Sequence, residues 1–184
     1  MTSPDRFTLP ARLLHWSMAA LILAMLLIGA AMVTSLGDYH ALVSLHRPVG
    51  ILILALALLR LAYRRRHAPP PLPADLPRWQ QHAAQASHLA LYGLMLALPL
   101  VGWAMLSAAR YPVALVGPLV LPPILPGNPM LYAGLRALHT VLAYALFGII
   151  LAHLGAALLH GLIRQDGVFA SMAPWRPRAG RPRD

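Results

Sequence analysis

Four long apolar runs, separated by short polar segments, organise this chain of 184 residues. Each run is long enough to cross the hydrocarbon core of a bilayer as an α-helix, which takes about 20 residues. The predicted helices cover residues 11–34, 42–65, 79–107 and 133–164. The pattern therefore predicts an all-α membrane protein in which four transmembrane helices form one bundle.

Proline marks the connections between the runs. Residues 67–77 form a proline-rich linker that is too broken for a helix, and residues 109–130 are too interrupted to span, so we expect them to pack over one mouth of the bundle. Pro48 is expected in the first turn of the second helix, where its missing N–H has no helical partner. The transmembrane domain then covers residues 1–167. Residues 168–184 form a basic tail, whose arginine-rich part (176–183) we expect to be disordered or bound to lipid headgroups.

Composition agrees with a small polytopic membrane protein. The chain is 59% hydrophobic and 11% charged, and its mean hydropathy is +0.63. It has no cysteine, which excludes disulfides, thiolate metal sites, covalent haem attachment and iron–sulfur ligation by this chain. The formal charge is +10, but the arginines lie at the ends of apolar runs and not on a soluble basic surface. We therefore expect lipid, and not nucleic acid, as the partner of these charges.

The arginines also predict an orientation. Twelve of the fifteen fall at the two termini and in the second connection. Three fall on the opposite side, namely Arg47, Arg110 and Arg136. Because cytoplasmic loops carry the excess of basic residues, both termini are predicted to lie in the cytoplasm.

Histidines inside the apolar runs are the candidate functional residues, because ionisable residues within membranes usually face the bundle interior. His139 and His153 are fourteen residues apart on the fourth run. Fourteen helical steps return the side chain to within about 40° of its starting direction and advance it by about 21 Å. His160 follows seven residues later, near the same face.

The predicted topology sorts the histidines into two depths. His46 and His139 fall toward the outer side, and four fall toward the cytoplasmic side: His15, His88, His153 and His160. Two depths with imidazoles from different helices suit two haems with bis-histidine ligation. Depth alone does not decide whether His15 or His88 is the partner of His153.

Other interpretations of the histidines remain open. His40, His67 and His82 lie near predicted helix ends and are expected to be interfacial. Zinc or copper transport usually recruits carboxylates or thiols, whereas every aspartate here lies outside the predicted spans and there is no glutamate. A non-redox membrane protein with structural histidines is a further alternative.

The histidines and their neighbours resemble the bacterial cytochrome b561 family, which is related to the cytochrome subunits of nickel–iron hydrogenases and formate dehydrogenases. The resemblance covers nearly the whole chain. It rests on motifs in all four runs: Leu14-His15-Trp16; Leu45-His46 with Gly50; His88 followed by Ala97-Leu98-Pro99; Leu138-His139 and Ala152-His153.

The resemblance implies two non-covalent haem b groups, with His15 and His153 as ligands of the cytoplasmic haem and His46 and His139 as ligands of the outer one. It implies electron transfer in the bacterial inner membrane between a quinone, such as ubiquinone, and a second partner. Some relatives take electrons from superoxide at the periplasmic face, so the donor here is expected to be a small anion or a protein. An oxidoreductase of the superoxide:ubiquinone type, a simple electron carrier and a haem-anchoring subunit of a separate dehydrogenase all stay open, as does homo-oligomerisation.

Four further residues are candidates around these sites. His88 and His160 could hydrogen-bond a quinone or pass a proton on the cytoplasmic side, because imidazole titrates near neutral pH. Arg47 directly follows His46, and Arg136 precedes His139 by three residues. Either guanidinium could pair a haem propionate or attract a small anion.

Overall fold

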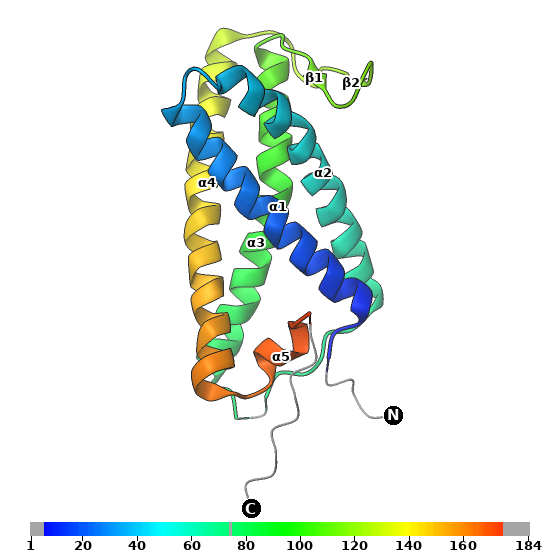
Figure 1. Cartoon of the computed structure of the whole chain (residues 1–184), viewed down its shortest axis with the longest axis vertical. Coiled ribbons are helices and arrows are strands. Elements are labelled where there is room, and N and C mark those ends of the chain that lie inside the picture. Colours follow the sequence, from blue (N-terminus) through cyan, green and yellow to red (C-terminus); the bar gives the residue numbers. More distant parts are fainter. Residues whose placement is uncertain (1–5, 74, 175–184) are drawn as a thin grey trace, which may run out of the picture.

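The computed structural model describes residues 6–73 and 75–174. Four long helices make up the bundle (Figure 1): α1 (Leu9–Thr34), α2 (Tyr39–Arg66), α3 (Arg78–Ala108) and α4 (Pro129–Leu158). The shorter elements are strands β1 (Val113–Ala114) and β2 (Val120–Leu121), the π-helical turn η1 (Leu159–Arg164) and helix α5 (Val168–Met172).

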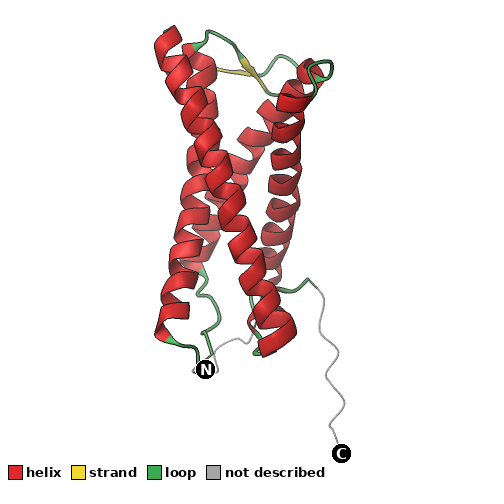
Figure 2. Ribbon diagram, turned by 90° about the vertical axis from the view of Figure 1, so that its left-hand side faces the viewer, coloured by secondary structure: helices red, strands yellow, loops and turns green. Residues whose placement is uncertain are grey.

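The helices run up and down, so the bundle has two distinct ends (Figure 2). We call the end where α1 begins, α2 ends, α3 begins and η1 ends the terminal end; α5 lies there (Figure 1). The opposite end carries the β1–β2 hairpin, and we call it the hairpin end.

All four long helices are long and apolar enough to cross a membrane, which confirms the predicted four-helix transmembrane bundle. Their outer faces carry large exposed apolar side chains, such as Leu27 (73% exposed), Val33 (82%) and Tyr144 (74%). In water such a surface would be a liability, but in hydrocarbon it is the expected one, because the helices satisfy their own backbone hydrogen bonds.

Packing is uneven around the bundle. Helix α1 packs on α2, α3 packs on α4, and α2 joins the two pairs through α3; along the described chain, α4 does not pack closely along α1 or α2. The buried core lies at mid-height and consists of Met18, Ile22, Ile53, Ala57, Met95 and Leu146. The histidines lie above and below this apolar layer.

Helix α2 differs from the expectation at its start. It begins at Tyr39 and not near residue 42, so Pro48 lies in the helix interior and not in its first turn. Nine helical residues precede Pro48, so its missing N–H removes one hydrogen bond from the helix interior. The helix nevertheless continues to Arg66. Pro129 does stand in a first turn, and Asn128 caps α4 by accepting from the N–H groups of Met130 (2.9 Å) and Leu131 (3.0 Å).

The segment between α3 and α4 contains two strands that the sequence did not predict. Val113 pairs with Leu121 and Ala114 with Val120. The hairpin packs against α2 and α3, where the Trp103 indole donates to the Pro122 carbonyl (2.9 Å). The segment therefore does not span, as expected, but folds over the hairpin end.

Residues 168–174, at the start of the predicted basic tail, pack against the bundle. Helix α5 folds back under the bundle (Figure 1), and the carbonyls at its C-terminal end accept hydrogen bonds from side chains at and before the start of α1. Arg6 and Arg12 donate to the Ala173 carbonyl (2.9 and 3.0 Å), and the Trp16 indole donates to the Met172 carbonyl (2.9 Å). The arginine-rich part of the predicted tail, 176–183, lies outside the described residues.

Candidate haem sites

At the hairpin end, His46 on α2 faces His139 on α4. Their ring centroids are 6.3 Å apart, and the ring planes meet at 63°. The Nδ1 atoms of both rings are buried and have no hydrogen-bond partner. A buried polar atom without a partner costs free energy, so this pair is arranged for something other than packing alone.

Glycines make room for these two rings. A Cβ built on Gly102 of α3 would lie 3.4 Å from Cε1 of His139, and one on Gly29 of α1 would lie 3.9 Å from Cε1 of His46. Each ring thus faces a neighbouring helix at a glycine, where no side chain stands between the ring and that helix.

At the terminal end three histidines converge. His15 on α1 lies 6.3 Å from His153 on α4, measured between ring centroids, with ring planes at 70°. His88 on α3 lies 5.7 Å from His153. His153 therefore has two neighbours, His15 and His88. The sequence predicts a quinone or proton site for His88.

The residues fit a haem at each level. In each pair two imidazoles from different helices face one another with ring centres 6.3 Å apart, which would leave room for one haem iron between them. These four histidines would hold the two haems. One pair joins α4 to α2 and the other joins α4 to α1, and α4 packs closely along neither helix. The rings therefore reach across the bundle interior. In the described chain, no three His or Asp side chains are close enough to hold a metal ion unaided.

An arginine that sequence reasoning passed over lies beside the terminal-end pair. Arg60 of α2 brings Nη1 to 2.9 Å from His15 Nδ1, and its Nε donates to the Tyr92 hydroxyl (3.0 Å). The signal was present in the sequence, because Arg60 interrupts an apolar run six residues before α2 ends. An arginine inside a span is a functional candidate in its own right.

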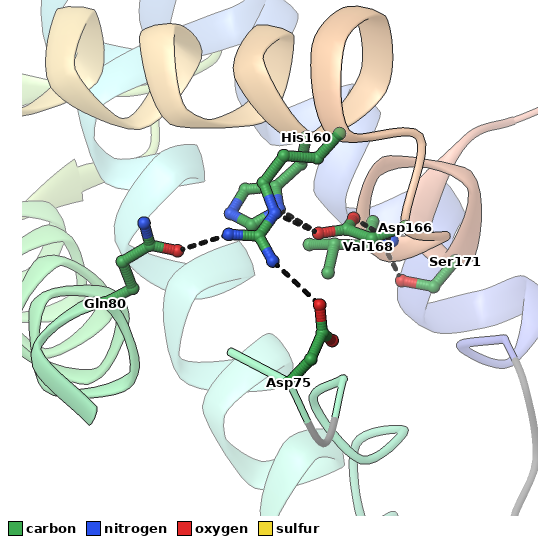
Figure 3. A network of polar contacts seen from close by, with 7 residues as sticks. Asp75, Gln80, His160, Asp166, Val168 and Ser171 are labelled. Carbon is green, nitrogen blue, oxygen red and sulfur yellow. Dashed lines mark hydrogen bonds and ion pairs between the residues drawn. The ribbon is translucent and has the colours of Figure 1, made fainter. Parts of the chain in front are cut away.

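His160 lies in a separate polar network at the terminal end (Figure 3). Its Nδ1 is 2.6 Å from Asp166 Oδ2, which also accepts from Arg164 Nε (3.1 Å). Arg164 in turn donates to Gln80 (3.1 Å) and Asp75 (3.2 Å), so the network ties η1 to the segment before and at the start of α3. Burial acts to raise the pKa of Asp166, but hydrogen bonds from His160 and the Val168 N–H outweigh it and hold that pKa below its ordinary value.

Two of the three outer arginines, Arg47 and Arg136, differ in surroundings. Arg47 is half-buried beside His46, and its Nε is buried with no hydrogen-bond partner. Arg136 is exposed on α4, one turn before His139. Among the described residues, Asp38 is the single acidic residue at the hairpin end, so this end carries a net positive charge.

Comparison with known proteins gives the same family at full length. The profile of the prokaryotic cytochrome b561 family matches residues 6–175. Cytochrome b561 homolog 2 of Escherichia coli (strain K12) is 32% identical over 176 residues, which cover 92% of this chain and 92% of that protein. Cytochrome b561 homolog 1 of the same organism is 34% identical over 131 residues, 71% of this chain and 74% of the relative.

A third relative carries a name that states an activity. The probable superoxide oxidase CybB of Yersinia pestis is 31% identical over 130 residues, 71% of this chain and 73% of the relative. With four apolar spanning helices, two facing histidine pairs and a profile match over nearly all its length, the chain belongs to the prokaryotic cytochrome b561 family.

Proposed function

We propose that this chain binds two haem b groups and carries electrons across the membrane from superoxide on the outer side to a quinone. The observation that carries the proposal is the equal 6.3 Å separation of two histidine pairs at opposite ends of one bundle. The chain is a multi-pass membrane cytochrome of the bacterial inner membrane, and its family implies haem b.

We assign His46 and His139 to the haem at the hairpin end, and His15 and His153 to the haem at the terminal end. His15 is preferred to His88 because its 6.3 Å distance from His153 equals that of the other pair, whereas His88 is closer, at 5.7 Å. When bound, haem b supplies one-electron redox chemistry. The chain's own contribution is to fix the four imidazoles on rigid helices and to exclude water between the two levels.

We further propose that the terminal end faces the cytoplasm, which makes 1–167 a transmembrane domain with both termini inside. The support is the arginine asymmetry, because Arg64, Arg65 and Arg66 close α2 at that end. The hairpin end then faces the periplasm. Arg47 and Arg136 lie there, and their charge favours an anionic donor and a propionate near His46 and His139.

Superoxide is the proposed donor because a relative is named as a probable superoxide oxidase and because the hairpin end is positively charged. Each superoxide anion gives up one electron and leaves as O₂. Two such electrons and two protons convert one quinone to its quinol. His88, beside His153, and His160, paired with Asp166, are the proposed groups that bind the quinone or pass those protons at the terminal end.

Purified full-length protein tests this function. A pyridine haemochrome assay is expected to give two haems per chain, and reduced-minus-oxidised spectra to show six-coordinate low-spin haem. His46→Ala and His139→Ala should each remove one haem, and His15→Ala and His153→Ala the other, whereas exposed His67→Ala should remove neither. One haem per chain in the unmodified protein, or no quinone reduction when superoxide is supplied, contradicts the proposal.

A further inference from the structure

Two arginines of α2 share one aromatic support at the terminal end. Arg60 and Arg64 are four residues apart and therefore on one face of the helix. Both guanidinium carbons lie over the ring of Tyr92 on α3, at 5.9 and 6.0 Å from its centroid. The Tyr92 hydroxyl also accepts from Arg60 Nε (3.0 Å). Tyr92 thus holds two positive charges side by side next to His15.

No carboxylate neutralises this pair within the described part of the chain. The two aspartates described at the terminal end, Asp75 and Asp166, are paired with Arg164, and Asp166 also with His160. Two half-buried guanidiniums at the edge of a membrane span are costly without a counter-ion. The site is therefore complementary to a ligand that brings negative charge.

The hydrogen bond with Arg60 limits what His15 can bind at the same time. A guanidinium carries only donors, so at 2.9 Å from Arg60 Nη1 the His15 Nδ1 has to be the acceptor, with the ring proton on Nε2. A neutral imidazole that binds iron through Nε2 carries its proton on Nδ1 instead. His15 cannot accept from Arg60 and bind iron through Nε2 in the same state.

We propose that Arg60 and Arg64 form the carboxylate clamp of the terminal-end haem, and that Arg60 moves from His15 to a haem propionate when His15 binds the iron. The inference rests on the proposed ligands His15 and His153. A pocket of about 30 Å³, lined by both arginines, Tyr92 and Met172, adjoins the guanidiniums, which is room for one small polar group such as a carboxylate head. Because both guanidiniums lie over the Tyr92 ring, the propionate meets two positive charges that are already at the site when Arg60 leaves His15.

A phosphate of a lipid headgroup could offer similar negative charge to these arginines, so the test has to separate the two sources. Haem b and its dimethyl ester differ only in the propionates, which the ester leaves uncharged. Reconstitution of the haem-depleted chain with each compound is measured in a His46→Ala background, which keeps only the terminal-end haem, with and without Arg60→Gln/Arg64→Gln. The clamp predicts that the chain with both arginines retains haem b better than the ester and that the chain without them retains both equally. Equal retention by the chain with both arginines overturns the clamp and leaves a lipid phosphate as the anion.

A second measurement uses the intact holoprotein. Transfer of haem to excess apomyoglobin is followed in a His46→Ala background, which keeps only the terminal-end haem. Arg60→Gln and Arg64→Gln are each expected to release it about 10- to 100-fold faster, because a charge-assisted hydrogen bond is lost. Arg60→Lys should fall between, since an ammonium keeps the charge but not the planar fork. Arg66→Gln is the matched control, because Arg66 is exposed and belongs to the same helix.

The outcomes separate this inference from the proposed function. Release from Arg60→Gln and Arg64→Gln at the rate of Arg66→Gln overturns the clamp, while the haem count and the histidine variants still support the two haem sites. A His15→Ala chain that keeps its terminal-end haem overturns the ligand assignment itself, whatever the arginine variants do. A low-spin spectrum in Arg60→Gln, with faster release, supports both.

Discussion

If His46 and His139 hold a haem, as we propose, replacing Gly102 by valine should remove that haem and leave the one proposed at His15 and His153 in place. The His139 ring faces α3 at this glycine, where a Cβ would lie 3.4 Å from Cε1 and 3.6 Å from Nδ1. The Cβ of an alanine at position 102 therefore makes an ordinary van der Waals contact with the His139 ring. Valine adds two methyl groups about 1.5 Å beyond that Cβ, which leaves too little space unless the ring moves.

The size of the effect follows from how little movement the site allows. His46 and His139, with ring centres 6.3 Å apart, would have to keep this separation to hold one haem iron between them, so a displaced His139 ring would no longer serve as a ligand. Overpacking a tight site costs about 1–3 kcal/mol, which corresponds to roughly 5- to 150-fold weaker haem binding. Gly102→Ala should keep both haems and, as a better helix former, stabilise α3 by up to about 1 kcal/mol.

Haem per chain and difference spectra of detergent-purified variants provide the assay. Gly93→Val is the matched control, because Gly93 lies on the same helix and a Cβ there meets nothing within 4 Å. The expected counts are two haems for Gly93→Val and Gly102→Ala and about one for Gly102→Val. Two haems and an unchanged spectrum in Gly102→Val, or equal loss in Gly93→Val, would refute the reasoning.

Three further predictions concern other parts of the chain. The pKa of Asp166 in the folded chain is below its ordinary value of 3.8. The Asp166–His160 pair therefore contributes its full stability above pH 3.8 and loses that contribution as the pH falls through the lower folded pKa. Thermal melts below about pH 4 should show the loss of stability, and Asp166→Asn should abolish this pH dependence. Asn128→Ala should cost about 1 kcal/mol of stability because the start of α4 loses its cap, whereas Asn128→Ser should not; equal melting temperatures would contradict this. Arg136→Ala should slow haem reduction by superoxide severalfold at low salt with both haems bound, and stopped-flow rates that do not vary with ionic strength would exclude steering by this charge.

Much of the fold could be predicted from hydropathy alone. A span is dictated by the thickness of the bilayer, and each apolar run obeys it independently of the others. The structure differs from the prediction where contacts between residues far apart in the sequence determine it. Helix α2 begins three residues before the predicted residue 42, and Pro48 lies inside it and not in its first turn, because a proline can also sit inside a membrane helix.

The β1–β2 hairpin and α5 also could not be predicted, because contacts with residues far away in the sequence hold them. Strands β1 and β2 have two residues each and are held by contacts with α2 and α3. Helix α5 has five residues and depends on carbonyl contacts with Arg12 and Trp16, which are more than 150 positions away in the sequence. Local propensity carries no information about such partners.

The candidate site was predictable in part. The fourteen-residue spacing of His139 and His153 needs only helical geometry. Which ring meets His153 depends on how α1 and α3 are rotated about their axes, and the chain brings both His15 and His88 to it. The seven-residue step to His160 assumed a regular helix, but η1 is a π-helix, whose wider turn changes the direction of the side chain.

The layer between the two histidine levels constrains what can cross the membrane. It consists of apolar side chains such as Met18, Ile22 and Ile53, and the aspartates of the described chain lie outside the spans. Electrons can cross such a layer between two haems, but protons have no chain of titratable groups to follow. Protons that reduce a quinone must therefore enter on the same side as the quinone. If the quinone binds at the terminal end, as we propose, His88 and the His160–Asp166 pair would provide that entry, next to η1 and α5.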